Sequence, residues 1–211
     1  MSHTRISITT GCAILLLSAM AAFAGDSPED IKKRIGTGNP VAGKDKSALC
    51  QGCHGEDGNS AISNFPKLAG QYAVYIQKQI HNFQAGSRKD PVMSDMAATV
   101  TDKQDLLDIS AYFASQKLMK GDSPVINPAG KERFMIGNGC VNCHGVTGKG
   151  AGPGNPDAPV IGGQHKDYLI KQLKDFGSGA RTNEPSGMMA LIASSMTDEE
   201  IEEVASYVSG L

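Results

Sequence analysis

The sequence has no tryptophan, and aromatic residues make up only 5% of its 211 residues. Cysteine is also scarce, with five in the whole chain. After residue 24 there is no apolar run of the roughly 20 residues that a membrane-spanning helix needs, so we expect a soluble mature chain. No basic patch indicates a nucleic-acid partner. Two halves with so few large rings would each have a thin core, and such small domains usually need a disulfide, a metal or a cofactor.

Residues 1–24 are predicted to be a secretory signal peptide. Arg5 supplies the positive start, residues 13–17 lie in a short apolar core, and Ala-Phe-Ala at 22–24 is a cleavage sequence. An uncleaved membrane anchor is the alternative, but the apolar run is too short for a span. Removal of the leader would leave 187 residues with four cysteines and a net charge of −3. We therefore expect the mature protein in the periplasm.

The four remaining cysteines form two motifs of one kind, Cys-x-x-Cys-His, at residues 50–54 and 140–144. This is the attachment pattern of c-type haem. Two thiols at this spacing reach two vinyl groups on one porphyrin edge, and the adjacent histidine is then held beneath the iron as an axial ligand. The motifs predict two covalent haem c groups, attached through Cys50, Cys53, Cys140 and Cys143, with His54 and His144 as axial ligands.

Three other uses of these cysteines fit less well. Disulfides suit an exported chain, but they do not require a histidine after each pair. A zinc ribbon places its two cysteine pairs about 15–20 residues apart, whereas 86 residues separate Cys53 from Cys140. A thioredoxin-like redox pair has no need of duplication. Two identical motifs behind a leader therefore favour haem.

The two motifs belong to a tandem repeat that covers most of the chain. Residues 66–71 recur as 159–164, and residues 75–80 recur as 168–173. Further matched positions are Phe83, Gly86 and Arg88 with Phe176, Gly179 and Arg181. The repeat predicts one haem domain used twice: an N-terminal domain over 25–119, a linker over 120–127 and a C-terminal domain over 128–211.

Each half is predicted to form three helices around its haem, so the fold class is all-α. Asparagine caps and helical spacing of apolar residues support this reading. The expected starts are Asn39 and Asn127 for the first helix, residues 71 and 164 for the second, and Thr101 and Thr197 as N-caps of the third. The third helix should bury one face in each half: Leu106, Ile109 and Phe113, then Ile201, Val204 and Val208.

A methionine in each half is the candidate for the second axial ligand, because His/Met ligation raises the haem potential, whereas an open sixth site favours ligand chemistry. The first half offers Met93 and Met96, and the second offers Met188 and Met189. Met93 and Met189 each lie eight residues before the threonine that starts the third helix. We therefore favour Met93 and Met189 as the ligands.

The distance from each methionine to the matched tyrosine of the third helix differs by one residue between the halves. Counted back from Tyr112 and Tyr207, Met93 is 19 residues away and Met189 is 18. A single insertion at the start of one helix would explain the difference. His81 and His165 are rival ligands, but neither histidine occurs in both halves, so we expect surface histidines at both positions.

These motifs together resemble the cytochrome c4 family of exported dihaem class I cytochromes c. The resemblance covers nearly all of the mature chain, through residues 50–60, 64–71, 163–165, 171–173, 181–183 and 207–211. It implies two tandem class I cytochrome c domains and His/Met ligation of both irons. It also implies that a backbone carbonyl near Pro66 or Pro159 orients His54 or His144. The two domains should meet in a pseudo-twofold contact with their haem propionate edges facing each other.

This resemblance favours a periplasmic electron carrier rather than an enzyme. The expected partners are redox proteins, namely a quinol-oxidising complex as donor and a terminal oxidase as acceptor. The alternative is an electron-transfer subunit of a periplasmic oxidoreductase, such as a flavocytochrome c sulfide dehydrogenase. A dihaem peroxidase would need an open iron site, which a methionine in both halves disfavours. We expect a monomer or weak dimer, and peripheral membrane association is compatible with this function.

Overall fold

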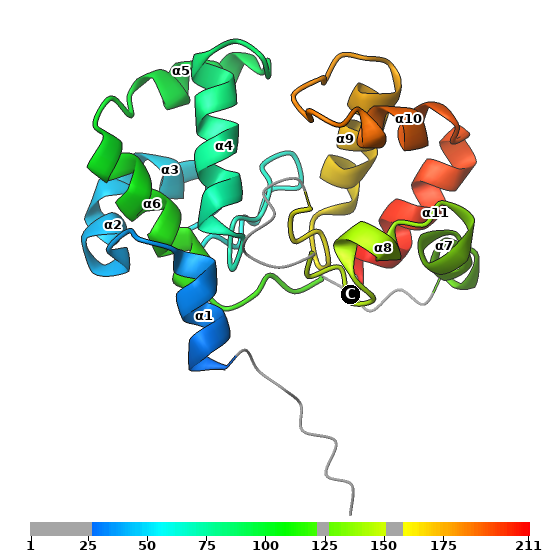
Figure 1. Ribbon diagram of the computed structural model, residues 1–211, viewed down its shortest axis with the longest axis horizontal. Helices are drawn as coiled ribbons and strands as arrows, with labels where there is room; N and C mark the ends of the chain where they lie inside the picture. The colour runs from blue at the N-terminus through cyan, green and yellow to red at the C-terminus, as the bar shows by residue number, and fades with distance from the viewer. Residues whose placement is uncertain (1–26, 122–126, 151–157) are drawn as a thin grey trace, which may run out of the picture.

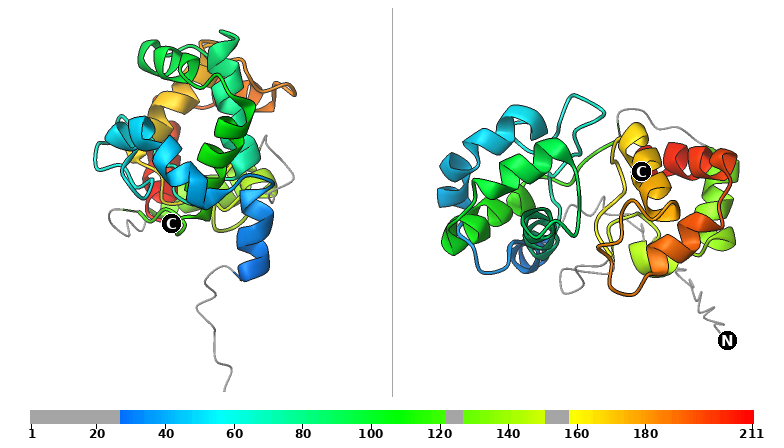
Figure 2. Two further views of the ribbon diagram at one scale, coloured as in Figure 1. Left: turned by 90° about the vertical axis from the view of Figure 1, so that its left-hand side faces the viewer. Right: turned by 90° about the horizontal axis from the view of Figure 1, so that it is seen from above.

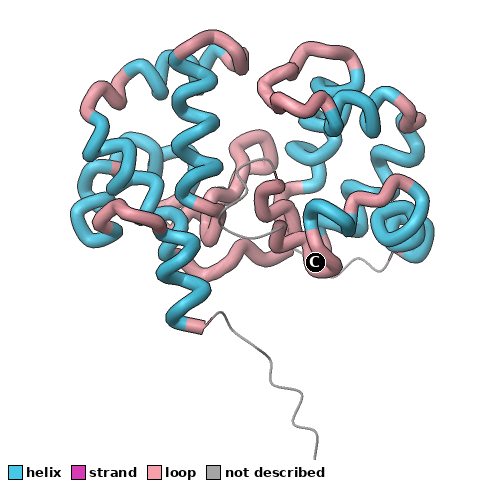
Figure 3. Tube along the Cα trace, viewed as in Figure 1, coloured by secondary structure: helices cyan, strands magenta, loops and turns pink. Residues whose placement is uncertain are grey.

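The computed structural model describes residues 27–121, 127–150 and 158–211. The expected leader at 1–24 and most of the expected linker lie outside these ranges. All regular structure within them is helical (Figure 3), which confirms the all-α class. The helices form two bundles that stand side by side, one from each half of the chain (Figures 1 and 2). None of the described helices is long and apolar enough to cross a membrane.

The N-terminal bundle contains six helices. In chain order they are α1 (Pro28–Ile35), α2 (Pro40–Lys46), α3 (Ala48–His54), α4 (Ala73–Gln84), α5 (Pro91–Ala98) and α6 (Lys103–Ser115). The expected first helix starts as predicted, because the Asn39 side chain accepts hydrogen bonds from the backbone N–H groups of Val41 and Ala42. It is interrupted at Ser47, which separates α2 from α3.

The C-terminal bundle repeats this order without a counterpart of α1. Its elements are α7 (Pro128–Glu132), a π-helical turn η1 (Arg133–Gly137), α8 (Val141–His144), α9 (Lys166–Gly177), α10 (Met188–Ser194) and α11 (Asp198–Ser209). The Asn127 side chain caps α7 through the backbone N–H of Gly130. The expected second helices correspond to α4 and α9, and the third to α6 and α11.

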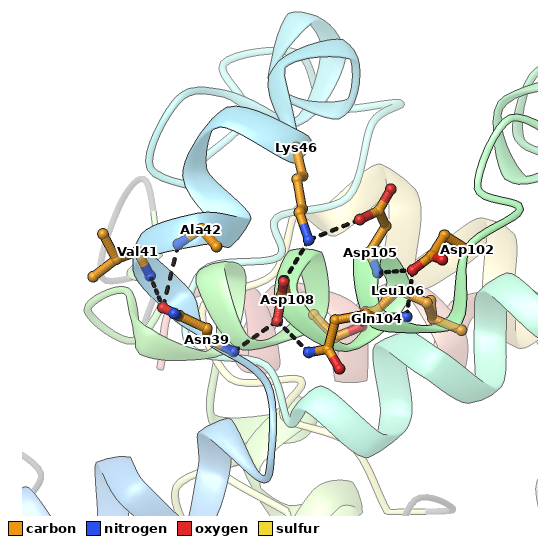
Figure 4. A network of polar contacts seen from close by, with 10 residues as sticks. Asn39, Val41, Ala42, Lys46, Asp102, Gln104, Asp105, Leu106 and Asp108 are labelled. Carbon is orange, nitrogen blue, oxygen red and sulfur yellow. Dashed lines mark hydrogen bonds and ion pairs between the residues drawn. The ribbon is translucent and has the colours of Figure 1, made fainter.

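A glycine lets α2 cross α6 at close range, and another lets α7 cross α11. A Cβ on Gly43 of α2 would lie 2.0 Å from the carbonyl oxygen of Asp108 on α6. A Cβ on Gly130 of α7 would lie 2.0 Å from the carbonyl oxygen of Glu203 on α11. In the N-terminal bundle the crossing is tied by Lys46 and Asp108 (Figure 4). Arg133 makes the corresponding ion pair with Glu203 in the other bundle.

The third helices bury the faces that their spacing predicted. Leu106, Ile109 and Phe113 are in the N-terminal core, and Ile201, Val204 and Val208 are buried in the C-terminal half. The N-cap of α6 is Asp102 rather than the expected Thr101, because the Asp102 carboxylate accepts from the backbone N–H groups of Gln104 and Asp105. Thr197 caps α11 as expected, in a capping box with Glu200.

Three short helices were not expected, namely α1, α5 and α10. Helices α5 and α10 fill the segments between the second and third helices of each half, where only candidate methionines were predicted. Asp90 caps α5 by accepting from the backbone N–H of Met93, and Pro91 occupies its first turn. Helix α10 follows Gly187, which adopts a left-handed conformation with φ of 66°.

Candidate haem-binding sites

Each Cys-x-x-Cys-His motif lies on a short helix that ends at its histidine. Helix α3 ends at His54 and α8 ends at His144, and each is followed by a glycine with positive φ, Gly55 or Gly145. The four cysteines of the motifs form no disulfide with one another. Burial raises the pKa of the Cys50 and Cys140 thiols, so these are not activated thiolates of a thiol redox enzyme.

The histidine of each motif is buried and oriented by one backbone carbonyl. His54 Nδ1 lies 2.8 Å from the carbonyl oxygen of Pro66. His144 Nδ1 lies 3.0 Å from the carbonyl oxygen of Pro159. A carbonyl can only accept, so Nδ1 carries the proton and Nε2 is left as a lone-pair donor. Burial lowers the pKa of both rings, which favours the neutral imidazole that a metal ligand requires.

Apolar side chains line the first site. Cys50 and Met93 both pack against one buried cluster, which also contains Ile76, Ile80, Phe83, Leu106, Ile109 and Phe113. The attachment cysteine and the predicted methionine ligand are therefore brought to the same core. In the second site Cys140 packs against a smaller cluster built around Phe134, Leu169, Val204 and Val208. These apolar walls fit a large apolar macrocycle.

The two favoured methionines occupy equivalent positions on α5 and α10. Each lies four residues before a buried alanine, Ala97 after Met93 and Ala193 after Met189. Both methionines are half-buried, whereas Met188 is 46% exposed. This shared position on the two helices agrees with the pairing of Met93 with Met189. It gives no distance to an iron, so the ligand role stays a prediction.

The segment between α5 and α6 explains the one-residue difference in the spacing from methionine to tyrosine. Asp102 and Thr197 each lie ten residues before the matched tyrosine of the following helix. The extra residue of the N-terminal half therefore falls between Ala97 and Asp102. An insertion was predicted at the start of one helix, and it lies just before α6.

A buried arginine of each domain reaches across to the other domain. Arg88 donates to its own domain's Gln79 at 2.7 Å, and to the Tyr168 hydroxyl and Gln172 Oε1 of the other domain at 2.9 Å each. Its guanidinium carbon also lies 4.7 Å from the centre of the Phe83 ring. Such contacts hold a cation between two domains.

Arg181 makes the symmetry-related set of contacts. It donates to Gln172 at 2.6 Å in its own domain, and to the Tyr75 hydroxyl at 3.2 Å and Gln79 at 3.3 Å in the other. Its guanidinium carbon lies 4.4 Å from the centre of the Phe176 ring. The repeat of Arg88 and Arg181 in the sequence was the signal that could have identified this interface.

The composition of this interface suits an anion. Both guanidiniums are buried, at 9% and 7% exposed, and neither makes a salt bridge to a carboxylate within the described residues. The hydroxyls of Tyr75 and Tyr168 accept from arginine, and within the same ranges neither phenol proton has an acceptor. Two cations and two free phenol donors fit carboxylates such as haem propionates. The residues present therefore fit the haem that the motifs imply.

The prediction that His165 is a surface histidine was wrong. His165 is 5% exposed, and its Nε2 lies 2.9 Å from the carbonyl oxygen of Ser60 in the other domain. The matching residue Tyr72 donates its hydroxyl to the Lys149 carbonyl at 2.6 Å. Both residues precede a long helix and tie it to the opposite domain. His81 is exposed, as expected.

Comparison with known proteins agrees with these sites. The cytochrome c family model matches residues 41–117 and 129–211. Cytochrome c4 of Pseudomonas aeruginosa is 41% identical over 182 residues, which cover 82% of this chain and 89% of the relative. The crystal structure of reduced recombinant cytochrome c4 from Pseudomonas stutzeri superposes with a TM-score of 0.75 at 39% identity, covering 82% of this chain and 99% of that one.

A relative with another name is similar over an even larger share of the chain. The thiosulfate dehydrogenase electron acceptor of Stutzerimonas stutzeri is 33% identical over 217 residues, covering 95% of this chain and 93% of the relative. Its similarity spans both haem domains. With two cytochrome c matches, two Cys-x-x-Cys-His motifs and relatives at about 40% identity, the chain belongs to the cytochrome c4 family and is a c-type cytochrome with two covalently attached haems.

Proposed function

We propose that this dihaem cytochrome is a periplasmic carrier that takes electrons from a quinol-oxidising complex and delivers them to a terminal oxidase. The observation that carries this proposal is the equivalence of the two sites. Each has a buried histidine fixed by a proline carbonyl, and each has a methionine four residues before a buried alanine. Two protein ligands per iron favour electron transfer over ligand chemistry.

When bound, each haem supplies an iron that takes up and releases one electron. The cysteines fix the macrocycle, and the histidine rings are held in one tautomer by Pro66 and Pro159. The apolar clusters against which Cys50 and Cys140 pack would keep water away from the bound macrocycle. In our assignment the axial ligands are His54 and Met93 at the first iron, and His144 and Met189 at the second.

Spectroscopy of the purified holoprotein tests the ligand assignment. Ferric His/Met haems show a weak far-red absorption band, and replacement of one ligand should remove the contribution of one haem. We expect Met93→Ala and Met189→Ala each to remove about half of the band, and Met96→Ala to leave it intact as a matched control. A full band in either ligand variant would refute that assignment.

The role of electron acceptor to a periplasmic dehydrogenase is the second candidate function. It is favoured by the relative named thiosulfate dehydrogenase electron acceptor, whose similarity covers almost the whole chain. In this role the protein would accept electrons from a sulfur-oxidising enzyme, either a flavoprotein sulfide dehydrogenase or a thiosulfate dehydrogenase. The same two haem sites would serve.

The two roles differ in what the protein binds. A carrier should purify as a redox-competent protein without a catalytic chain, and should transfer electrons from reduced quinol-oxidising complex to oxidase in a reconstituted assay. A dehydrogenase subunit should co-purify with a catalytic chain from its native source. Reduction by such an enzyme and its substrate, without turnover with the respiratory complexes, would decide for the second role.

A further inference from the structure

A hydrogen-bonded peptide unit connects the first histidine to the other domain. The carbonyl of Pro66 lies 2.8 Å from His54 Nδ1, and the N–H of Lys67 donates to Gln164 Oε1 at 2.8 Å. Pro66 C=O and Lys67 N–H are the two ends of a single planar peptide group. The chain of contacts therefore runs from the side chain of Gln164, through one peptide, to the ring of His54.

The second histidine has the same connection in the reverse direction. The carbonyl of Pro159 lies 3.0 Å from His144 Nδ1, and the N–H of Val160 donates to Gln71 Oε1 at 3.0 Å. Each glutamine thus belongs to one domain and reaches the histidine of the other. The arrangement is reciprocal, as expected for a pseudo-twofold contact between two copies of one domain.

Both glutamines are fixed in place by several contacts. The amide nitrogen of Gln164 donates to the Lys67 carbonyl at 2.9 Å, and that of Gln71 donates to the Val160 carbonyl at 2.8 Å. Each Oε1 also accepts from the backbone N–H of the next residue, at 3.0 Å from His165 or Tyr72. The side chains are only 5% and 4% exposed for Gln164 and Gln71. These amides are therefore held in one orientation in a buried interface.

The direction of these bonds determines their effect on the histidines. Donation by a peptide N–H shifts electron density toward the carbonyl of that peptide, so the carbonyl accepts a hydrogen bond more strongly. A stronger acceptor on Nδ1 makes the imidazole a better electron donor at Nε2. A more electron-rich axial ligand stabilises ferric iron more than ferrous iron, and so lowers the reduction potential of that haem.

We propose that Gln164 and Gln71 are positioning residues that act across the domain interface: Gln164 tunes the first haem through His54, and Gln71 tunes the second through His144. This rests on the proposed function in one respect, since it requires both histidines to ligate iron. The reduction potential of each haem then depends in part on the domain that carries the other haem. Separation of the domains would raise both potentials.

Potentiometry of the Gln164→Leu holoprotein tests the first half of the proposal. Leucine fills similar volume but cannot accept from Lys67. NMR-monitored redox titration follows the shifted haem methyl resonances and so gives a potential for each haem. We expect the equilibrium constant for reduction of the first haem to rise about threefold, which is about 28 mV at 59 mV per tenfold, with the second haem unchanged. Gln71→Leu should give the mirror result.

A matched control separates tuning from loosening of the interface. Tyr72→Phe removes the hydroxyl that donates to Lys149 across the same interface but leaves both peptide connections intact. It should move neither potential. Unchanged potentials in both leucine variants, equal shifts of both haems in one variant, or an equal shift in Tyr72→Phe would each overturn the proposal.

A second substitution covers the case in which the leucine variants do not accumulate. Gln164→Asn keeps an amide at this buried position but shortens the side chain by one methylene, which withdraws its oxygen from Lys67 N–H, so the first haem potential should rise as in Gln164→Leu. No change at the first haem would overturn the proposal. The axial ligands are tested independently by the wild-type spectra. His/Met spectra at both haems with unmoved potentials in the glutamine variants would therefore refute the tuning and leave the function intact.

Discussion

Asp108 of α6 ties the last helix of the N-terminal bundle to α2 and its N-cap residue Asn39 (Figure 4). Its carboxylate accepts from the backbone N–H of Asn39 at 2.8 Å, from Lys46 Nζ at 2.6 Å and from Gln104 Nε2 at 2.8 Å. The side chain is only 4% exposed. Asp108→Asn removes the charge and turns an amide nitrogen or a weaker oxygen toward Lys46. We expect this isosteric change to destabilise the bundle.

The magnitude follows from the pKa of this carboxyl. Hydrogen bonds from Lys46 and from the Asn39 N–H lower the pKa of Asp108 from 3.8 to about 2. A carboxyl with this difference between its unfolded and folded pKa contributes about 2 kcal/mol to stability at neutral pH. Because the folded pKa is the lower one, this contribution is present above about pH 4. It is lost as pH falls through about 2.

Urea unfolding of the holoprotein, followed by helical circular dichroism at several pH values, measures the effect. Asp108→Asn should lower the free energy of unfolding by about 2 kcal/mol at pH 7, and the difference from wild type should shrink below pH 4. Asp105→Asn is the control, since Asp105 also contacts Lys46 at 2.7 Å but is 45% exposed; it should cost under about 1 kcal/mol. An equal loss at pH 7 and pH 2.5 would show that the charge is not the cause.

Two further changes test the packing of the N-terminal bundle. Gly43→Ala places a Cβ 2.0 Å from the Asp108 carbonyl oxygen, so α2 must move and stability should fall by about 3 kcal/mol or more; thermal unfolding at wild-type stability would contradict the close crossing. Gln84→Ala removes donation to the carbonyls of Ala97 and Val100 at 2.9 and 2.8 Å, at the end of the helix that carries Met93. The substitution should lower the free energy of unfolding by about 1–2 kcal/mol. It should also speed displacement of the methionine ligand by imidazole, which stopped-flow absorption measures. An unchanged rate would show that Gln84 does not hold this helix in place.

The haem sites were predictable because their chemistry is local in the sequence. Two thiols and a histidine must lie within five consecutive residues to hold one macrocycle, so the spacing alone carries the information. The apolar periodicity of α4, α6, α9 and α11 was equally readable, since each has three turns or more and one buried face. The halves could therefore be assigned to one fold twice.

The short helices were missed because their local signals are weak. Helix α5 has eight residues and α10 has seven, too few to show a clear apolar face. An Asp-Pro start at Asp90 and Pro91 was the available signal for α5. The N-cap residue of α10 is Gly187, which has no side chain to accept a hydrogen bond. Its first two N–H groups are instead met by Ser186 Oγ and Glu184 Oε2, at 3.3 Å each, and the helix packs against α9. The third-helix cap was misplaced because Thr101 and Asp102 are both good caps, and only geometry chooses between them.

The contacts between the domains could not be derived from periodicity, because they join residues about 80 to 106 positions apart. His165 shows the error this causes. Its lack of a histidine partner at Tyr72 suggested a surface residue, yet both side chains donate to a carbonyl of the opposite domain. A phenol and an imidazole can fill the same place when only one donor is required. Comparison of residue types between repeats therefore underestimates shared roles.

The two tuning positions illustrate which parts of a duplicated interface are free to diverge. Gln71 and Gln164 are the same residue in both halves, and each uses its whole amide. The residues they bind are Lys67 in one half and Val160 in the other. The side chains can differ because the glutamines contact only the backbone N–H and C=O groups of these two residues. The side chain at position 67 or 160 is therefore available for other contacts. Lys67 does so, as its ammonium group donates to the Lys120 carbonyl at 2.7 Å at the start of the expected linker. The symmetric contact to the haem ligands thus rests on backbone and glutamine, and asymmetry between the two domains can accumulate around it without disturbing either iron.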